Sequence, residues 1–312
     1  MKRYLLRTFG CQMNVHDSLR LEEALAPHGY KRAGQAEQAD LVIFNTCSVR
    51  EKAEQKLVNA VGALAELRQR NPRLVVVVAG CVAQQHGRAL LDRLPLVDLV
   101  IGPDNIAHLP ELLARFRPGG PALCRTDFDL ERPTFLAAQT RGPAQRVTAY
   151  VTVMKGCDQK CTFCVVPNTR GPERYRTSQA IVDEIGRLAA SGVREVTLLG
   201  QTVNSWREPS GQGEPAGRAF AWLLHRIAAE VRTLDRLRYT APHPSFLTPE
   251  LITAHAELQL LPWHLHLPAQ SGSDRVLRRM VRHYTRASFV EACARLREAR
   301  PGLTLSTDLI VG

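Results

Sequence analysis

Residues 147–164 read VTAYVTVMKGCDQKCTFC, and this stretch decides the fold of the second half of the chain. Residues 147–154 fit a β-strand, and three cysteines follow that strand directly, at Cys157, Cys161 and Cys164. In α/β barrels the loop after a strand lies on the functional face. The stretch therefore predicts a cysteine site on the first strand-to-helix loop of a barrel-like domain.

Strand and helix patterns continue to alternate to residue 312, which favours a partial or full α/β barrel. The expected strands are 147–154, 194–200, 236–240, 263–267 and 303–310. The expected helices are 178–190, 219–230, 249–258, 274–281 and 286–299. Residues 205–218, SWREPSGQGEPAGR, are expected to form a loop because they are rich in Gly, Pro and polar side chains.

The first ~115 residues show the same alternation, in line with the usual ~100–200 residues of a domain. Residues 41–44 and 74–79 are apolar throughout, as expected of strands buried on both faces, and helix patterns cover 50–70 and 84–93. This predicts a doubly wound parallel α/β domain over residues 1–116. Residues 117–142 are rich in Pro and Gly and are assigned to a linker, which leaves 143–312 for the second domain.

Composition limits the class of protein. With 45% hydrophobic and 23% charged residues, the 312-residue chain has an ordinary globular composition. The net charge of +11 permits a polyanionic partner such as nucleic acid, although an arginine-rich composition explains it nearly as well. The N-terminus lacks the apolar core of a signal peptide, and the longest apolar run is far below the ~20 residues of a membrane helix. We therefore expect a cytoplasmic protein with no membrane partner.

The eight cysteines are too sparse for a disulfide-stapled secreted fold, so metal or redox chemistry comes first. Cys157, Cys161 and Cys164 lie close enough in sequence to wrap one metal centre. A structural zinc site is the alternative, but it usually has four protein ligands. Three thiolates fit better to a 4Fe-4S cluster that keeps one iron open for a ligand.

A second set comprises Cys11, Cys47 and Cys81, which are spaced by 36 and 34 residues and each follow a predicted strand. Ligands of open parallel sheets bind outside the carboxyl ends of the strands, where neighbouring strands are ~4.8 Å apart. These cysteines can therefore converge. The alternative is that each is a small buried apolar residue, but three at matching positions favour a second open cluster. Cys124 and Cys293 match no such pattern and are taken as structural.

Seven runs in the chain match a known family. They are TFGCQMNVHDS (8–18), NTCSVREKAEQK (45–56), AGCVAQQ (79–85), GCDQKCTFCVVPNTRGPE (156–173), LLGQTVNSW (198–206), HLPAQSGSDRVLRRMVRHYT (266–285) and STDLIVG (306–312). In these runs the chain resembles the methylthiotransferases among the radical S-adenosylmethionine (SAM) enzymes. Within that group it looks like the tRNA-2-methylthio-N6-dimethylallyladenosine synthases.

The resemblance implies two 4Fe-4S clusters and SAM as cofactors. Cys157, Cys161 and Cys164 would hold the cluster that binds and reductively cleaves SAM. The resulting radical would abstract hydrogen from C2 of an N6-isopentenylated adenosine next to the tRNA anticodon. Cys11, Cys47 and Cys81 would hold the auxiliary cluster that carries the sulfur, which is methylated by a second SAM and inserted at C2.

The resemblance also implies partners. They are the anticodon loop of an isopentenylated tRNA and an electron donor such as a flavodoxin or ferredoxin, while the sulfur donor is left open. The enzyme is expected to be a monomer. Exposed arginines are candidates for RNA phosphate contacts, with a solvated surface as the equal alternative. These arginines are Arg170, Arg174, Arg176, Arg278, Arg279, Arg282 and Arg286.

Residues at the ends of two further predicted strands are candidates for the SAM pocket. Gly200 and Gln201 end the second strand of the barrel-like domain, and Gln270 and Ser271 follow the fourth. The alternative role for each is a turn or a helix cap. Histidines near strand ends, such as His243, are more often hydrogen-bonded structural residues than ligands.

In the family, the core continues past the motif at 306–312 and a small RNA-binding β-barrel domain called TRAM follows. We therefore expect a C-terminally truncated enzyme without TRAM and with weakened tRNA affinity. Alternatives are a sister methylthiotransferase acting on threonylcarbamoyladenosine in tRNA or on a ribosomal-protein aspartate, and a non-catalytic zinc and RNA-binding protein. A plain iron–sulfur electron carrier is a further alternative, but such carriers usually complete four-cysteine ligation.

Overall fold

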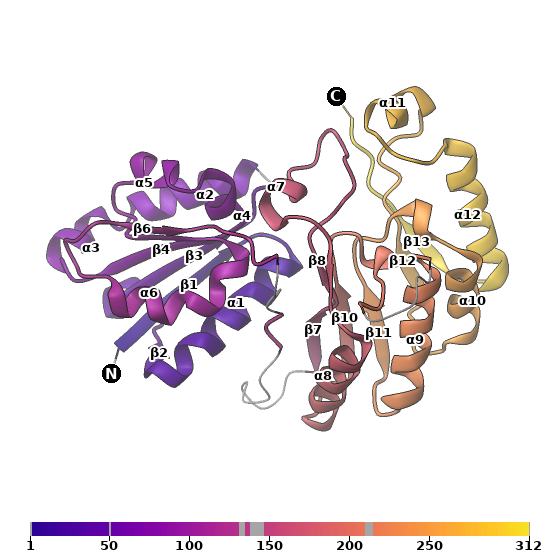
Figure 1. Ribbon diagram of the computed structural model, residues 1–312, viewed down its shortest axis with the longest axis horizontal. Helices are drawn as coiled ribbons and strands as arrows, with labels where there is room; N and C mark the ends of the chain where they lie inside the picture. Colours follow the sequence, from indigo (N-terminus) through magenta and orange to yellow (C-terminus); the bar gives the residue numbers. More distant parts are fainter. Residues whose placement is uncertain (1, 50, 131–134, 138–146, 210–214, 312) are drawn as a thin grey trace. The chain divides into compact units, whose positions relative to one another are not determined.

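The computed structural model describes residues 2–49, 51–130, 135–137, 147–209 and 215–311. The chain divides into two compact units (Figure 1). The first comprises Met1–Leu136 and Val165–Gly171, and the second comprises Ala137–Cys164 and Pro172–Gly312. The segment that follows Cys164 thus packs with the first unit, although it lies within the sequence of the second.

The first unit is built on a parallel sheet of six strands in the order β2-β1-β3-β4-β5-β6. The strands are β1 (Lys2–Phe9), β2 (Tyr30–Arg32), β3 (Leu41–Thr46), β4 (Val75–Gly80), β5 (Leu99–Ile101) and β6 (Leu123–Arg125). Because the chain goes from β1 outward to β2 and then returns to β3, the strand order reverses between β1 and β3. Open α/β sheets bind their ligands at this switch point, outside the carboxyl ends of the strands.

Helices cover both faces of this sheet, and alternate residues of β3 show why. Leu41 and Ile43 pack with α1 (Gln12–Leu25), η3 (Pro103–His108) and α6 (Leu109–Arg115) in one core. Val42 and Phe44 pack in a second core with the helices on the opposite face. Those helices are α2 (Glu51–Gly62), α3 (Ala65–Arg70), α4 (Cys81–His86) and α5 (Ala89–Arg93). The predicted doubly wound fold is confirmed.

Three details of the first unit differ from expectation. The helix expected over 50–70 is two helices, α2 and α3, and the one expected over 84–93 is broken at Gly87, whose φ is 52°. β6 lies inside the stretch 117–142 that was assigned to a linker, because its backbone pairs with β5. Residues 131–134 and 138–142 of that stretch lie outside the described residues.

The second unit contains the five expected parallel strands, divided between two sheets. β7 (Thr148–Thr152), β10 (Glu195–Leu199) and β11 (Arg236–Tyr239) form one sheet in the order β11-β10-β7. β12 (His264–His266) pairs with β13 (Thr304–Ser306) in the other. β8 (Met154–Lys155) and β9 (Arg174–Tyr175) form a short antiparallel pair. In the described part of the chain no ladder joins β11 to β12, so the parallel strands form a partial barrel.

Three of the α-helices described in the second unit begin at a threonine cap. The helices described in this unit are α8 (Ser178–Ala190), α9 (Arg218–Glu230), α10 (Pro249–Glu257), α11 (Asp274–Arg279) and α12 (Arg286–Ala299), with the short helices η4 (Val203–Ser205) and η5 (Pro244–Phe246). Hydroxyls of Thr177, Thr248 and Thr285 accept backbone N–H bonds at the starts of α8, α10 and α12. The core contains fully buried Trp206 and Phe220. Trp206 lies within the expected loop 205–218, of which 210–214 fall outside the described residues.

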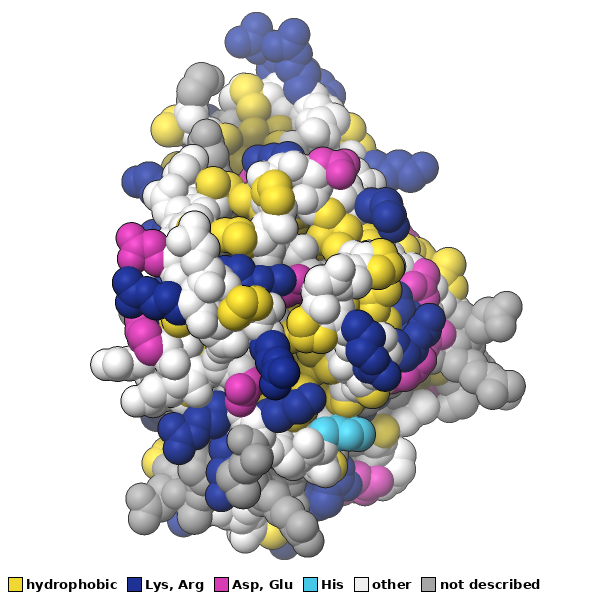
Figure 2. Space-filling model, turned by 90° about the vertical axis from the view of Figure 1, so that its left-hand side faces the viewer, with side chains coloured by type: hydrophobic (Ala, Val, Ile, Leu, Met, Phe, Trp, Pro, Cys, Tyr) yellow, Lys and Arg dark blue, Asp and Glu magenta, His cyan; other side chains and the backbone are white. Residues whose placement is uncertain are grey.

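Among the described residues, no helix has the length and apolar character needed to cross a membrane. Figure 2 shows one face of the molecule, on which Lys and Arg side chains are spread among acidic, hydrophobic and other side chains. The net charge of +11 therefore does not gather into a single basic patch on this face.

A partly buried ion pair ties α3 to the amino edge of the first sheet. Arg68 donates to both carboxylate oxygens of Asp98, at 2.8 and 2.7 Å, and Asp98 also accepts the Val76 N–H. We expect Arg68→Met to lower the free energy of unfolding by about 2 kcal/mol, because it leaves a largely buried carboxylate without its cation. Urea unfolding followed by circular dichroism measures this. A change below about 0.5 kcal/mol would contradict the prediction.

Candidate metal centres

The strand register explains why Cys11, Cys47 and Cys81 converge. Phe9 pairs with Thr46 across β1 and β3, and Thr46 pairs with Gly80 across β3 and β4. Each cysteine follows its strand within one or two residues, so the three lie at the carboxyl edge, beside the switch point. The Cys11 and Cys47 side chains are close enough to shift each other's pKa. The structure therefore brings together the three cysteines of this predicted site.

The environment of these thiols favours thiolate formation at Cys11. A hydrogen bond from the Cys47 thiol lowers the pKa of Cys11 to about 5, against the opposing effect of burial. The same hydrogen bond, with burial, raises the pKa of Cys47. The Cys47 sulfur also accepts the N–H of Val49, at 3.4 Å. A thiolate is the form that binds a metal.

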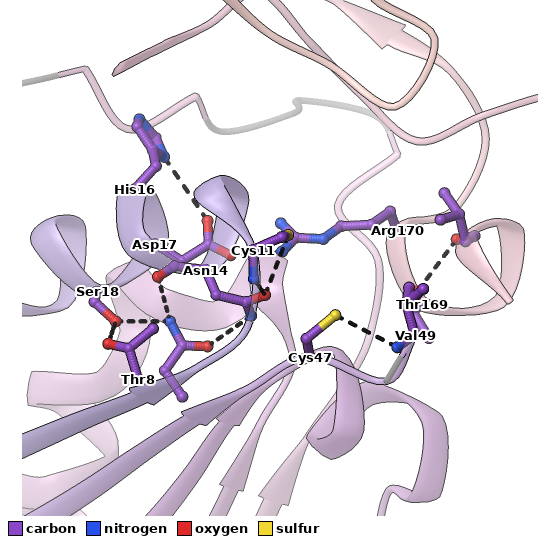
Figure 3. Close-up of polar contacts among 12 residues, drawn as sticks. Thr8, Cys11, Asn14, His16, Asp17, Ser18, Cys47, Val49, Thr169 and Arg170 are labelled. Carbon is purple, nitrogen blue, oxygen red and sulfur yellow. Dashed lines mark hydrogen bonds and ion pairs between the residues drawn. The ribbon is translucent and has the colours of Figure 1, made fainter. Parts of the chain in front are cut away.

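A buried polar network lies under the cysteines (Figure 3). Asn14 Oδ1 accepts the Cys11 N–H at 3.3 Å, and Asn14 Nδ2 donates to Asn45 Oδ1 at 3.2 Å. Asn45 Nδ2 donates to the carbonyl of Asn14 at 2.8 Å and to the hydroxyl of Ser18 at 2.9 Å. Both asparagines are fully buried. The network fixes the end of β1 against the end of β3 and thereby the positions of two of the three sulfurs.

Two glycines leave room for this network. A Cβ atom on Gly10 would lie 2.3 Å from Asn14 Oδ1 and 2.8 Å from the Cβ of Cys47. A Cβ on Gly80 would lie 2.3 Å from Asn45 Oδ1, and Gly80 has a φ of +91°. Side chains at these two positions would collide with the groups that place the cysteines.

Arg170, at the end of α7 (Val166–Arg170), is buried beside the same cysteines. Its Nη2 atom lies 2.6 Å from Asp17 Oδ2. Burial alone would raise the pKa of Asp17, but Arg170 and His16 lower it to about 2. Asp17 is thus a carboxylate that holds the guanidinium in place.

The expectation that Arg170, Arg174 and Arg176 face RNA phosphates is wrong for this structure. All three side chains are buried. Arg170 pairs with Asp17, Arg176 pairs with Glu184, and Arg174 donates to the carbonyl of Pro172. Periodicity does not predict burial for arginines in irregular segments, because only tertiary partners can compensate a buried charge.

The residues at this site fit a group that is held by three well-separated thiolates. In the described ranges, no three His, Cys, Asp or Glu side chains are grouped closely enough to hold a single metal ion. A four-iron cluster spaces its thiolates more widely, since each sulfur binds a different iron. Two hydroxyls that flank Cys47, those of Thr46 and Ser48, are buried and have no hydrogen-bond partner among the described residues. Unpartnered polar groups beside three thiols are consistent with a site built around a further group.

The second set of cysteines lies on the loop after β8. Cys157 and Cys161 are buried and Cys164 is half-buried. The Cys157 sulfur is 3.1 Å from the hydroxyl of Thr202, and Arg282 donates to the Cys161 sulfur at 3.3 Å. Burial raises the pKa of the Cys157 thiol, and the Thr202 hydrogen bond opposes that effect. The loop is thus held by the end of β10 on one side and by the segment after α11 on the other.

The expected SAM-pocket residues have different positions relative to this loop. Gly200 and Gln201 directly precede Thr202, so they lie beside the cysteine loop, and Gln201 Oε1 is buried without a partner among the described residues. Gln270 has a φ of 63° and pairs through its backbone with the strand-like segment at Asp308 and Ile310. The hydroxyl of Ser271 accepts a hydrogen bond from the N–H of Ser273. This is a turn contact, which was the alternative to a role in the SAM pocket.

Sequence reasoning missed several residues that organise this second site. Asn204 exchanges two hydrogen bonds with the backbone of His243, at 2.9 and 2.7 Å. The His243 ring packs against Tyr284, with centroids 5.6 Å apart, and burial with nearby Arg282 and His283 lowers its pKa to about 3. Asn204 lies near a strand end and within the matching run 198–206, which was the available signal. Tyr284 lies outside any strand, and its signal was its place within the matching run 266–285.

A further missed residue, Glu173, links the cysteine loop to the end of β10. Its carboxylate accepts the hydroxyl of Ser205 at 3.0 Å, and its N–H donates to Asp158 Oδ1 at 3.0 Å. Burial raises the pKa of this carboxyl. Glu173 therefore joins the residue after Cys157 to the loop that carries Thr202.

Comparison with protein families defines the class. Residues 151–312 match the family described as "Radical SAM superfamily", and residues 3–102 match the one described as "Uncharacterized protein family UPF0004". The first of these matches covers more than half of the chain. Enzymes of this superfamily use SAM together with a 4Fe-4S cluster.

Curated relatives indicate a particular family within the radical SAM superfamily. Proteins named tRNA-2-methylthio-N(6)-dimethylallyladenosine synthase from Sorangium cellulosum, Anaeromyxobacter dehalogenans and Agrobacterium fabrum are 57%, 48% and 44% identical to this chain. Each alignment includes 100% of this chain, which spans 66%, 65% and 69% of the three relatives. The chain therefore belongs to the radical SAM superfamily and, within it, to the methylthiotransferase family that these synthases represent.

Solved structures support the fold. The radical SAM methyltransferase TsrM from Kitasatospora setae matches with a TM-score of 0.64 at 16% identity, over 100% of this chain and 70% of that one. The cobalamin-dependent SAM radical enzyme OxsB matches with a TM-score of 0.66 at 14% identity, over 99% of this chain and 49% of that one. At these identities the likeness concerns the fold alone.

Proposed function

We propose that this chain carries the catalytic part of a tRNA methylthiotransferase, which converts N6-isopentenyladenosine next to the anticodon to its 2-methylthio derivative. The observation that carries the proposal is that each unit presents a set of three cysteines, rather than four: the first at the carboxyl ends of three parallel strands, the second on the single loop after β8. Three-thiolate sites leave one iron open for a ligand. The names of the curated relatives favour the isopentenyladenosine branch over the sister branches.

We assign Cys157, Cys161 and Cys164 to the cluster that binds SAM, and Cys11, Cys47 and Cys81 to the auxiliary cluster. The domains would be 1–116 for the auxiliary site and 143–312 for the radical SAM core, with 117–142 between them. When bound, the cofactors supply one-electron cleavage of SAM and a sulfur for transfer. The protein's part is to position these groups and to exclude water.

Individual side chains have distinct roles in this proposal. Thr202 and Arg282 direct hydrogen bonds at the sulfurs of Cys157 and Cys161, and such bonds tune the potential of a cluster. Glu173 holds the cysteine loop through Asp158. Asn14 and Asn45 set the spacing at the other site.

The deciding experiment is anaerobic reconstitution of the protein with iron and sulfide, followed by reaction with SAM, dithionite and an isopentenylated anticodon stem-loop. We expect about eight irons per chain, formation of 5′-deoxyadenosine, and a 2-methylthio nucleoside detected by mass spectrometry. Methylthiolation of a threonylcarbamoyladenosine stem-loop instead would move the chain to a sister branch. Bound zinc without iron would contradict the proposal.

Gln201 is proposed to contact SAM, because its Oε1 atom is buried beside the cysteine loop without a partner among the described residues. We expect Gln201→Leu to weaken SAM binding by roughly tenfold, since it removes one hydrogen-bonding group worth about 1.4 kcal/mol. Equilibrium dialysis against the reconstituted protein measures this. Gln179→Leu, on the exposed face of α8, is the control that should leave SAM affinity unchanged.

Arginines of α11 and the start of α12 are proposed to bind tRNA phosphates. Arg278, Arg279 and Arg286 are exposed and form no ion pair among the described residues. α11 borders the cysteine loop, because Thr162 hydrogen-bonds the carbonyls of Arg279 and Met280 at 3.1 and 3.2 Å. A basic surface beside a reaction site suits a polyanionic substrate.

We expect Arg278→Gln combined with Arg279→Gln to weaken tRNA binding and to reduce the slope of log K against log salt by about two. Fluorescence anisotropy at several salt concentrations measures both quantities. Arg295→Gln, an exposed arginine later on α12, serves as the matched control. An unchanged slope in the double variant would remove α11 from the RNA interface.

The remaining partners follow from this chemistry. Cluster reduction needs a one-electron donor, and a flavodoxin or ferredoxin would supply it. Because the six thiols must stay reduced, we place the protein in the cytoplasm. We propose a monomer, which light scattering of the reconstituted protein tests.

A further inference from the structure

Arg170 is a buried cation whose neighbours are a carboxylate and two thiols. Its side chain is 4% exposed, and that of its ion-pair partner Asp17 is 7% exposed. Asp17 is in turn 3.8 Å from the ring of His16. Figure 3 shows the Arg170 side chain extending from α7 toward Asp17 and Cys11. An arginine side chain is rarely buried unless its charge is paired with another group.

Contacts with the cysteines place this cation at the first metal centre. α7 packs against α4, the helix that begins with Cys81. The guanidinium charge acts on the Cys81 and Cys11 thiols, and each of these interactions favours the charged form of its partner. Asp17 accepts a hydrogen bond from Nη2 of Arg170. A guanidinium has five N–H donors, so this bond does not use all of them.

We propose that Arg170 is a positioning residue of the first site: its buried guanidinium, held by Asp17 and carried on the helix that packs against α4, fixes a positive charge beside the Cys81 and Cys11 sulfurs and offsets the negative charge that thiolates and a cluster place there. The inference rests on the proposed function, which assigns an auxiliary cluster to these cysteines. It adds a residue outside the cysteine motifs, and a role that differs from phosphate binding.

Charge arithmetic gives the expected consequence. Three thiolates in a buried pocket repel one another, and one carboxylate already lies beside Arg170. Reduction of a cluster adds a further negative charge, so a fixed nearby cation raises the reduction potential. A planar guanidinium can bond a carboxylate and a sulfur at the same time, whereas a lysine supplies a point charge with less directional control.

The position of Arg170 in the chain links the two cysteine sites. Arg170 lies six residues after Cys164, in the segment Val165–Gly171 that packs with the first unit. One continuous stretch of sequence therefore supplies the three cysteines of the second site and a positioning residue of the first. No property of the sequence pattern around Arg170 predicts that division.

The test uses the full chain with Cys157→Ala, Cys161→Ala and Cys164→Ala, so that the first site alone can hold a cluster. Arg170→Met, Arg170→Lys and Asp17→Asn are each added to this background. Iron and sulfide are counted after reconstitution, and the midpoint potential is measured by a redox titration followed by electron paramagnetic resonance. Neither readout requires turnover.

We expect Arg170→Met to reduce cluster affinity by about 10-fold or more and to shift the midpoint potential to a more negative value. Arg170→Lys should restore most of the potential, because the charge remains. Asp17→Asn keeps the guanidinium but loosens it, so an intermediate effect is expected even if Arg170→Met folds poorly.

Arg68→Met is the control, since it breaks another arginine–carboxylate pair, partly buried and at the opposite edge of the same sheet. It should lower stability and leave the potential unchanged. Full iron content and an unchanged potential in Arg170→Met would overturn the inference while leaving the proposed function intact. A background protein that binds no four-iron cluster would overturn both.

Discussion

Replacing Cys157 by alanine is expected to abolish 5′-deoxyadenosine formation, whereas replacing Cys81 is expected to abolish methylthiolation while SAM cleavage continues. Each loss should reach about 10³-fold or more, the scale for removal of an essential group. The two sets of three cysteines, here called triads, lie in different units, so each cluster should assemble without the other. Chromatographic assay of 5′-deoxyadenosine and mass spectrometry of the nucleosides separate the two outcomes.

Cys293→Ala provides the control for this comparison. Cys293 is half-buried on α12 and belongs to neither triad, and burial raises the pKa of its thiol. Both activities should survive its replacement. If Cys81→Ala lost SAM cleavage as fully as Cys157→Ala, the assignment of separate tasks to the two sites would be wrong.

Replacing Gly80 by alanine is expected to destabilise the first unit by roughly 3 kcal/mol and to empty its cluster site. The added Cβ would lie 2.3 Å from Asn45 Oδ1 and 2.9 Å from the carbonyl oxygen of Thr46. Alanine is also strained at a φ of +91°. Because Asn45 holds the end of β3 against β1, relief of the collision moves Cys47 and Cys11 apart.

Urea unfolding of the apo protein measures the stability change, and iron analysis measures the cluster loss. Gly62→Ala, at the end of α2, is the matched control, since a Cβ there meets no atom within 4 Å. That control should be neutral or stabilise by about 0.5 kcal/mol. Normal iron content in Gly80→Ala would show that the Asn45 network does not set the site.

Strand positions in the first unit were predictable because β3 and β4 are buried on both faces, which leaves continuous apolar runs at 41–44 and 74–79. The break in the helix at Gly87 and the addition of β6 were not. A glycine is tolerated in many helices, and β6 is a three-residue edge strand of half-buried residues with no clear period.

The cysteines of both sites were predictable for different reasons. Cys157, Cys161 and Cys164 are close in sequence, so their spacing alone suggests one centre. Cys11, Cys47 and Cys81 were predicted to form a site from the rule that parallel strands end at one edge, and the register from Phe9 through Thr46 to Gly80 places the three strand ends side by side. Contacts between distant segments give Thr202, Tyr284 and Arg282 their roles. A local sequence pattern does not predict such contacts.

The alternation of strands and helices and the two sets of three cysteines could be read from the sequence, because they depend on local periodicity and on residue spacing. The family followed from the resemblance of seven runs of sequence. Only the tertiary structure decided that Arg170 and Arg176 are buried ion-pair partners rather than surface cations, and that the Asn14–Asn45 pair fixes the first site. The reason is physical: a buried charge or amide is stable only with a specific partner, and those partners lie far away in sequence.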